Sequence, residues 1–240
     1  MEKIEDLFVG LEFDEKEHRY YKDGEEYISV NKFIERFTTP FDTLKIAGYS
    51  AKKEGVSVEE ILKRWKNKVD AGSLFHETAH MYYLDYSVTG DVENAYALTP
   101  VENIYEFFKE CIIDTLEIAS AERRIFCDKI KIAGTPDIVA KNPKTGKYII
   151  IDYKTNNDLK KSYKKTLKEP FNDAETNLNK YKIQLSMYAH MLEEKGLAVE
   201  DLWIIHSRPD GWELIKLGLD YLYKLKTYFN NNSTWLEEHL

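Results

Sequence analysis

The chain has 240 residues, of which 43% are hydrophobic and 32% are charged, and its formal net charge is −8. This composition is typical of a soluble globular protein, and no apolar run approaches the roughly 20 residues that a membrane span needs. The negative charge argues against a protein that coats nucleic acid through a basic surface. Cys111 and Cys127 are too few for a disulfide framework or a four-cysteine metal site. Acidic residues at the N-terminus do not fit a signal or transit peptide, so we expect an intracellular protein without membrane association.

The first half of the chain is predicted to fold as a β-hairpin followed by helices. Apolar and aromatic runs on either side of Asp23-Gly24 predict the hairpin. Helix starts are indicated by the capping box of Ser57 and Glu60 and by Thr99-Pro100, and Gly72 is expected to interrupt the first of these helices. The expected elements are a hairpin at 11–30 and helices at 29–36, 57–69, 73–86 and 100–118.

The second half of the chain is predicted to contain three strands, a helix, a strand with its hairpin partner, and a final helix. The expected strands are 121–127, 131–140, 147–153, 202–206 and 212–217, and the expected helices are 174–195 and a segment from 220 onwards. The polar stretch 156–173 is the best candidate for a mobile loop. The element order αβββαβ indicates an α/β fold.

The most informative stretch is GTPDIVAKNPKTGKYIIIDYKT, residues 134–155. A turn signal at its centre separates two apolar runs, which predicts a β-hairpin. A turn centred between residues 144 and 145 pairs positions whose numbers sum to 289, so Asp137 lies opposite Asp152, with Lys154 on the same face as Asp152. Two such carboxylates suit Mg²⁺ or Mn²⁺, and the lysine can hold a phosphate or help to deprotonate a water. An ordinary amphipathic hairpin with a charged outer face fits the same residues.

Several motifs in order resemble the PD-(D/E)XK nuclease superfamily, whose name Pro136-Asp137 and Asp152-x-Lys154 spell out. Gln184-x-x-x-Tyr188 looks like the QxxxY signature of the RecB-type exonuclease branch, and Gly72–His76 resembles the GxxxH element of that branch. The resemblance covers about residues 72–206 and implies a mixed central sheet flanked by helices. Because the chain lacks the four cysteines of the iron–sulfur subgroup, it is similar to the cluster-free, lambda-exonuclease-like or stand-alone phage-type members.

The resemblance also implies a role for each residue and a division of the chain. Residues 71–240 would form the nuclease domain, and residues 1–70 would form a hairpin and helical extension packed on it. Asp137, Asp152 and Lys154 would be catalytic. The implied metal ligands for Mg²⁺ or Mn²⁺ are His76, Asp137, Asp152 and the backbone carbonyl of Tyr153. Gln184 and Tyr188 would position the active-site hairpin or the DNA strand. Glu122 would contact the metal ligands without binding the metal itself.

These observations predict a Mg²⁺-dependent deoxyribonuclease, an exonuclease that acts on single-stranded or frayed duplex ends in replication, recombination or repair. It would work in the cytoplasm of a bacterial or phage-infected cell, with a recombination or replication protein as its partner. The alternative is a structure-specific or nicking endonuclease of the same fold. Two remoter hypotheses are a DNA-binding module that does not cleave and a zinc protease, since residues 76–80 match HExxH. The extended protease pattern is absent, because Tyr83 and Tyr86 stand where it requires Gly and His.

Overall fold

The computed structural model describes residues 4–15, 17, 19–89, 110, 112, 115–208 and 210–232, with 81–89 as backbone alone. The chain divides into two compact units, one formed by Met1–Thr38 with Asn103–Leu240 and the other by Thr39–Glu102. The first 38 residues share a unit with the C-terminal half of the chain. Whether residues 1–70 form a separable extension of a nuclease domain at 71–240 stays a prediction.

Among the described residues, the strands of the larger unit form two five-stranded sheets. The first sheet has the order β1 (Glu12–Asp14), β2 (Arg19–Lys22), β3 (Glu25–Ser29), β6 (Ile132–Gly134) and β5 (Ile125–Cys127). The predicted hairpin is confirmed: β2 and β3 pair antiparallel around Asp23 and Gly24, whose φ angles of 54° and 81° suit a tight hairpin turn. β3 then pairs in parallel with β6, so the N-terminal hairpin is part of the same sheet as residues a hundred positions later.

The second sheet carries the residues on which the functional prediction depends. Its order is β10 (Gly211–Lys216), β9 (Val199–Arg208), β8 (Tyr148–Lys154), β7 (Ile138–Lys141) and β4 (Glu117–Ala121). β8 and β9 are parallel and the other neighbours are antiparallel, so the sheet is mixed, as expected. In the β7–β8 hairpin Ile138 pairs with Ile151 and Lys141 with Tyr148. This is the predicted register, in which paired residue numbers sum to 289.

Two of the expected strands are wrong in extent, since each is divided between the two sheets. The run 121–127 is split into β4 and β5, and 131–140 is split into β6 and β7. Glu122 has φ 49°, a left-handed conformation that a strand cannot continue through, and it lies at the first break. Pro136 lies at the second break and has no N–H to donate to a ladder. The chain therefore changes sheets directly before Asp137.

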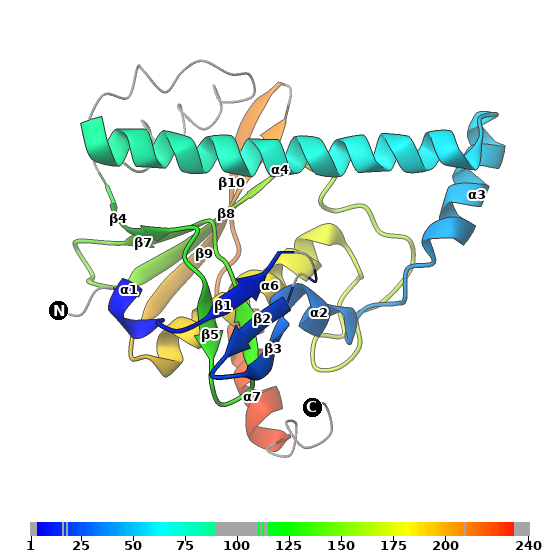
Figure 1. Ribbon diagram of the computed structural model, residues 1–240. Helices are drawn as coiled ribbons and strands as arrows, with labels where there is room; N and C mark the ends of the chain where they lie inside the picture. Colours follow the sequence, from blue (N-terminus) through cyan, green and yellow to red (C-terminus); the bar gives the residue numbers. More distant parts are fainter. Residues whose placement is uncertain are drawn as a thin grey trace. The chain divides into compact units, whose positions relative to one another are not determined.

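Helix α6 (Asn177–Glu194) is the central helix of this unit and confirms the prediction for 174–195. It contacts β8 and β9 of one sheet and β5 of the other (Figure 1). Nearly all of its second half is buried. This half of the helix therefore lies within the hydrophobic core of the unit. The shorter helices in the described part of this unit are α1 (Ile4–Leu7), α2 (Val30–Glu35) and α7 (Asp220–Asn231), the last two of which were predicted.

The smaller unit contains α3 (Thr43–Glu54) and α4 (Val58–Thr89). The expected interruption at Gly72 is wrong, because α4 continues through it. One glycine costs a helix only about 1 kcal/mol, and Ala71 and Leu74 beside it are strong helix formers. The expected helix at 100–118 lies almost wholly outside the described residues, although β4 already begins at Glu117. No helix in the described part of the chain is long and apolar enough to cross a membrane.

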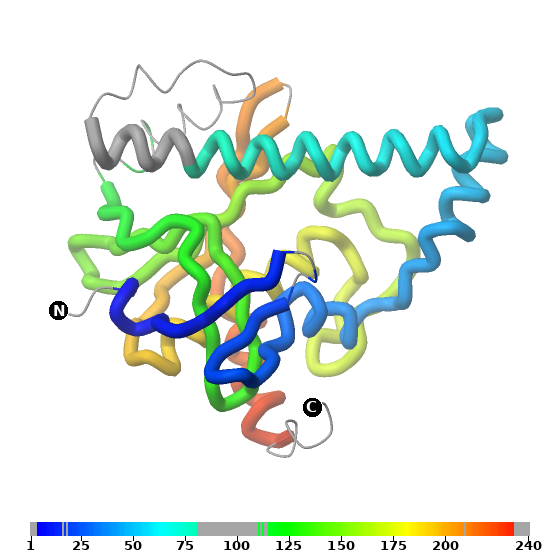
Figure 2. Tube along the Cα trace, viewed as in Figure 1, coloured from blue at the N-terminus to red at the C-terminus, as the bar shows by residue number. Residues whose placement is uncertain are grey.

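The connection 155–176, between β8 and α6, contains the stretch 156–173 that the sequence predicts to be a mobile loop. It has no helix or regular strand, and Figure 2 traces its path in yellow-green. Leu159, Leu167 and Phe171 are nevertheless buried, and the Phe171 ring packs 4.9 Å from that of Tyr221. These side chains anchor the segment to the core, so it follows a defined path between the end of β8 and the start of α6.

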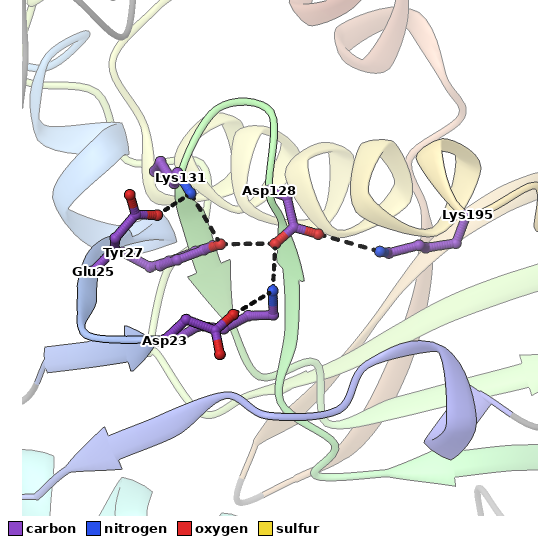
Figure 3. Close-up of polar contacts among 7 residues, drawn as sticks. Asp23, Glu25, Tyr27, Asp128, Lys131 and Lys195 are labelled. Atoms are coloured by element: carbon purple, nitrogen blue, oxygen red, sulfur yellow. Dashed lines mark hydrogen bonds and ion pairs between the residues drawn. The ribbon is translucent and has the colours of Figure 1, made fainter.

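A cluster of charges around Asp128 ties the N-terminal hairpin to the turn between β5 and β6 (Figure 3). The Asp128 Oδ1 atom accepts hydrogen bonds from the Tyr27 hydroxyl at 2.8 Å and from Lys22 Nζ at 3.0 Å. Its other oxygen lies 3.4 Å from Lys195 Nζ, just beyond the end of α6. Burial alone would raise the pKa of Asp128, but the hydrogen bonds from Tyr27 and Lys22 outweigh it and lower the pKa below its ordinary value. The hairpin is thus fastened to the core by charge as well as by strand pairing.

Candidate active site

The β7–β8 hairpin brings Asp137, Asp152 and Lys154 together at one end of the second sheet. Asp152 and Lys154 project from the same face of β8, and Lys154 Nζ forms an ion pair with Asp152 Oδ2. Asp137 directly precedes β7, and its Oδ2 accepts a hydrogen bond from the backbone N–H of Tyr153 at 2.7 Å. The two carboxylates are almost fully buried, at 6% and 2% exposure, and the lysine side chain is 12% exposed. The predicted convergence is therefore present, while the catalytic role of each residue stays a prediction.

The electrostatic environment of Lys154 keeps it charged. Burial by itself lowers the pKa of Lys154, since a buried ammonium loses its hydration. The negative charges of Asp152 and Asp137 act in the opposite direction and prevail, so that the pKa lies above its ordinary value. A charged lysine can donate hydrogen bonds to a phosphate oxygen.

Glu122 lies closer to the centre of the site than the sequence prediction placed it. Its backbone N–H donates to the carbonyl oxygen of Asp137 at 2.9 Å, and carboxylate oxygens of the two residues lie within 4.8 Å of each other. The positive φ of Glu122 is a costly conformation for a residue with a side chain, and such strain is concentrated at functional sites. A pair of carboxylates at this separation fits a divalent cation with oxygen ligands, so Glu122 is a candidate for direct metal binding.

Gln184 and Tyr188 lie one turn apart on α6, as predicted, and Gln184 Nε2 donates to the Tyr188 hydroxyl at 3.3 Å. The Tyr188 ring packs against Gly134, the last residue of β6. Burial and the charges of Asp152 and Asp137 raise the pKa of Tyr188 well above its ordinary value, so the phenol stays neutral. Tyr188 therefore supports the short segment that leads from β6 to Asp137, which agrees with a positioning role.

Three further residues next to Lys154 were not found from the sequence. The Tyr181 ring centroid lies 4.5 Å from Lys154 Nζ, and the Tyr181 hydroxyl donates to Asn156 Oδ1 at 2.6 Å. His206 Nε2 lies 2.6 Å from the carbonyl oxygen of Asn156, and His206 pairs with Lys154 across β8 and β9. The available signal was the position of Tyr181, one helical turn before Gln184 and hence on the same side of α6.

The remaining predicted site residues are placed as follows. Tyr153 lies within β8, and its role as a carbonyl ligand stays a prediction. His76 lies on α4 in the smaller unit, half-buried, with its ring 6.1 Å from that of Phe75. His80 lies one turn further along the same helix. The role of His76 as a metal ligand stays a prediction. The positions of His76 and His80 on α4 do not decide whether the two histidines form a zinc site.

Comparison with known proteins identifies the family. Residues 49–217 match the model of the PD-(D/E)XK nuclease superfamily, a span of well over half the chain. The chain belongs to this superfamily. It is also similar to the solved structure of SSO0001, with 13% identity over 91% of this chain and 80% of that chain and a TM-score of 0.38. A protein from Eubacterium rectale named "putative exonuclease" gives 12% identity, coverage of 88% and 80%, and a TM-score of 0.38. No curated protein matches the chain.

Membership of the superfamily makes the chain a nuclease, and these nucleases generally use divalent metal ions. The donors in the described site fit such an ion, because the Glu122 and Asp137 carboxylates lie within 4.8 Å and Asp152 supplies a third carboxylate on the neighbouring strand. Hard oxygen ligands of this kind suit Mg²⁺ or Mn²⁺ better than Zn²⁺, which favours nitrogen and sulfur.

Proposed function

We propose that this nuclease is a Mg²⁺-dependent deoxyribonuclease of the RecB-type, lambda-exonuclease-like branch, and that it hydrolyses phosphodiester bonds from DNA ends. The observation that carries the proposal is the buried cluster of Asp137, Asp152 and Lys154 on the β7–β8 hairpin, with the Glu122 carboxylate beside it. Burial of two carboxylates and an ammonium costs free energy, which argues for a cluster that is kept for its chemistry rather than for stability. Chemistry on a phosphate with bound metal is of this kind.

Each residue has a defined part in this proposal. A bound Mg²⁺ would supply a Lewis acid for the phosphate and lower the pKa of a water molecule. Asp137, Asp152 and Glu122 would hold the ion through their carboxylates, and His76 and the Tyr153 carbonyl are the further ligands that the family resemblance implies. Lys154 would donate a hydrogen bond to an oxygen of the scissile phosphate and offset the charge that develops there.

The preference for DNA ends is supported by the segment between β8 and α6. The segment begins directly after Lys154 and ends at the start of α6, the helix that carries Gln184. Buried side chains anchor it to the core. It also presents exposed lysines that can contact phosphate, namely Lys160, Lys161, Lys164 and Lys168. A strand held along such a segment is admitted more readily from a free end, because melting an internal duplex costs roughly 1.4 kcal/mol per base-pair step.

The test is a digest of end-labelled linear DNA and covalently closed circular DNA, each with Mg²⁺ and with EDTA. We expect linear DNA to be degraded progressively from an end, faster as single strand or frayed duplex, while closed circles survive. Rapid nicking of closed circles would favour the structure-specific or nicking endonuclease of the same fold. A matched RNA substrate tests the choice of DNA. The cytoplasmic location and a recombination or replication partner belong to the same proposal.

A further inference from the structure

Tyr181 lies between the proposed catalytic lysine and the chain that follows it. We propose that Tyr181 is a positioning residue for Lys154, acting through its ring on the ammonium and through its hydroxyl on the backbone beyond β8. The inference rests on the proposed function in one respect, since a loss of cleavage follows only if Lys154 takes part in it. Tyr181 lies outside the motif residues Gln184 and Tyr188.

The first contact is between the ring and the ammonium. Lys154 Nζ lies 4.5 Å from the centroid of the Tyr181 ring, within the range in which an ammonium is attracted to an aromatic face. The ammonium also forms an ion pair with Asp152. The long and flexible lysine side chain thus has two partners, a carboxylate and a ring, which together leave it fewer rotamers than the carboxylate alone would.

The second contact fixes the backbone where the sheet no longer does so. Lys154 is the last residue of β8, so strand pairing ends at this position. Two positions later, Asn156 is held from both sides: its side-chain oxygen accepts from the Tyr181 hydroxyl at 2.6 Å, and its carbonyl oxygen lies 2.6 Å from His206 Nε2. Because a carbonyl oxygen can only accept, His206 must carry its proton on Nε2. These hydrogen bonds continue the order of the strand past the lysine.

The chemistry of Tyr181 suits this task. Burial raises the pKa of the Tyr181 phenol above its ordinary value, so the hydroxyl stays protonated and able to donate. Its ring is supplied by α6, whose second half is almost wholly buried, and α6 also supplies Gln184 and Tyr188. One rigid helix would therefore set the position of Lys154 and support the segment before Asp137.

The experiment compares Tyr181→Leu, which removes both ring and hydroxyl, with Tyr181→Phe, which keeps the ring. Tyr223→Leu is the matched control, because Tyr223 is 61% exposed on α7. We expect Tyr181→Leu to lower kcat by about 10- to 100-fold with little change in KM, as for a misplaced catalytic group. Tyr181→Phe should recover most of this loss, and Tyr223→Leu should match the wild type. A kcat of Tyr181→Leu within twofold of the wild type would overturn the inference.

A second readout does not depend on cleavage. Acetylation of lysines with an amine-reactive ester, read by mass spectrometry, should modify Lys154 faster in Tyr181→Leu than in the wild type. Lys22, which is 23% exposed and pairs with Asp128, should react at an unchanged rate, and this would exclude general unfolding. Equal labelling of Lys154 in the two proteins would refute the positioning role. If the wild type failed to cleave any DNA, the proposed function would fall, and the labelling would still decide what Tyr181 does.

Discussion

Replacement of Gly134 by alanine tests the packing that places Asp137. A Cβ atom at this position would lie 2.6 Å from Tyr188 Cε1 and 3.0 Å from Val30 Cγ2. Carbon atoms make favourable contact at about 3.5–4.0 Å, so the ring would have to move by about 1 Å. Overpacking of this kind costs about 1–3 kcal/mol, and Gly134→Ala should lower the free energy of unfolding by that amount. Because the displaced ring supports the segment before Asp137, nuclease activity should fall as well.

Gly48 provides the matched control for this change. Gly48 lies within α3, and a Cβ atom added there would have no atom within 4 Å. Gly48→Ala should therefore raise the free energy of unfolding by about 0.5–1 kcal/mol, because alanine favours the helix more than glycine does. Urea denaturation followed by circular dichroism measures both variants. The double variant Gly134→Ala with Tyr188→Leu should lose less unfolding free energy than the sum of the two single variants, since the second change removes the clashing atoms. If Gly134→Ala were as stable as Gly48→Ala, the packing argument would be refuted.

Three further predictions concern the metal, the histidines and the charge cluster. DNA cleavage should require Mg²⁺ or Mn²⁺ and stop with EDTA. Ca²⁺ should bind without supporting cleavage, because it is larger. Full activity with zinc alone, above all hydrolysis of the protein casein, would instead support a protease. Cleavage should be lost far more in His76→Ala than in His80→Ala, whereas equal losses would show that the ligand is misassigned. The lowered pKa of Asp128 means that its ionised form stabilises the fold above an unfolded pKa of about 3.9, and that this stabilisation is lost as the pH falls through the folded pKa. Since the Asp128 side chain is 44% exposed, Asp128→Asn should lower the free energy of unfolding by less than about 1 kcal/mol at pH 7, as measured by urea denaturation. If the difference between variant and wild type were equally large at pH 2, the stabilising role of the ionised Asp128 would be contradicted.

The local parts of the fold were predictable from the sequence. The β7–β8 register followed from a short turn and two apolar runs, because a tight hairpin leaves little freedom in pairing. The helix α6 and the β2–β3 turn at Asp23 and Gly24 were likewise given by local signals. The convergence of Asp137 with Asp152 and Lys154 depended only on this hairpin, which is why it could be predicted.

The parts that depend on distant contacts could not be predicted. The division of 131–140 into two strands requires β6 to pair with β3, which lies about a hundred residues earlier in the chain. The approach of Glu122 to Asp137 depends on a left-handed turn that no residue type there demands. Tyr181 carries no motif of its own, and its role becomes visible only when α6 is packed against the end of β8.

The central claim is that Asp137, Asp152 and Lys154 form a metal-dependent site for phosphodiester hydrolysis. The most direct measurement is the single-turnover rate of cleavage of end-labelled DNA by the wild type and by Lys154→Ala, with Mn²⁺ binding to each protein measured by calorimetry. We predict that Lys154→Ala binds the metal nearly as well as the wild type and has lost cleavage, whereas Asp137→Asn and Asp152→Asn lose both. Cleavage by Lys154→Ala at the wild-type rate would contradict the account.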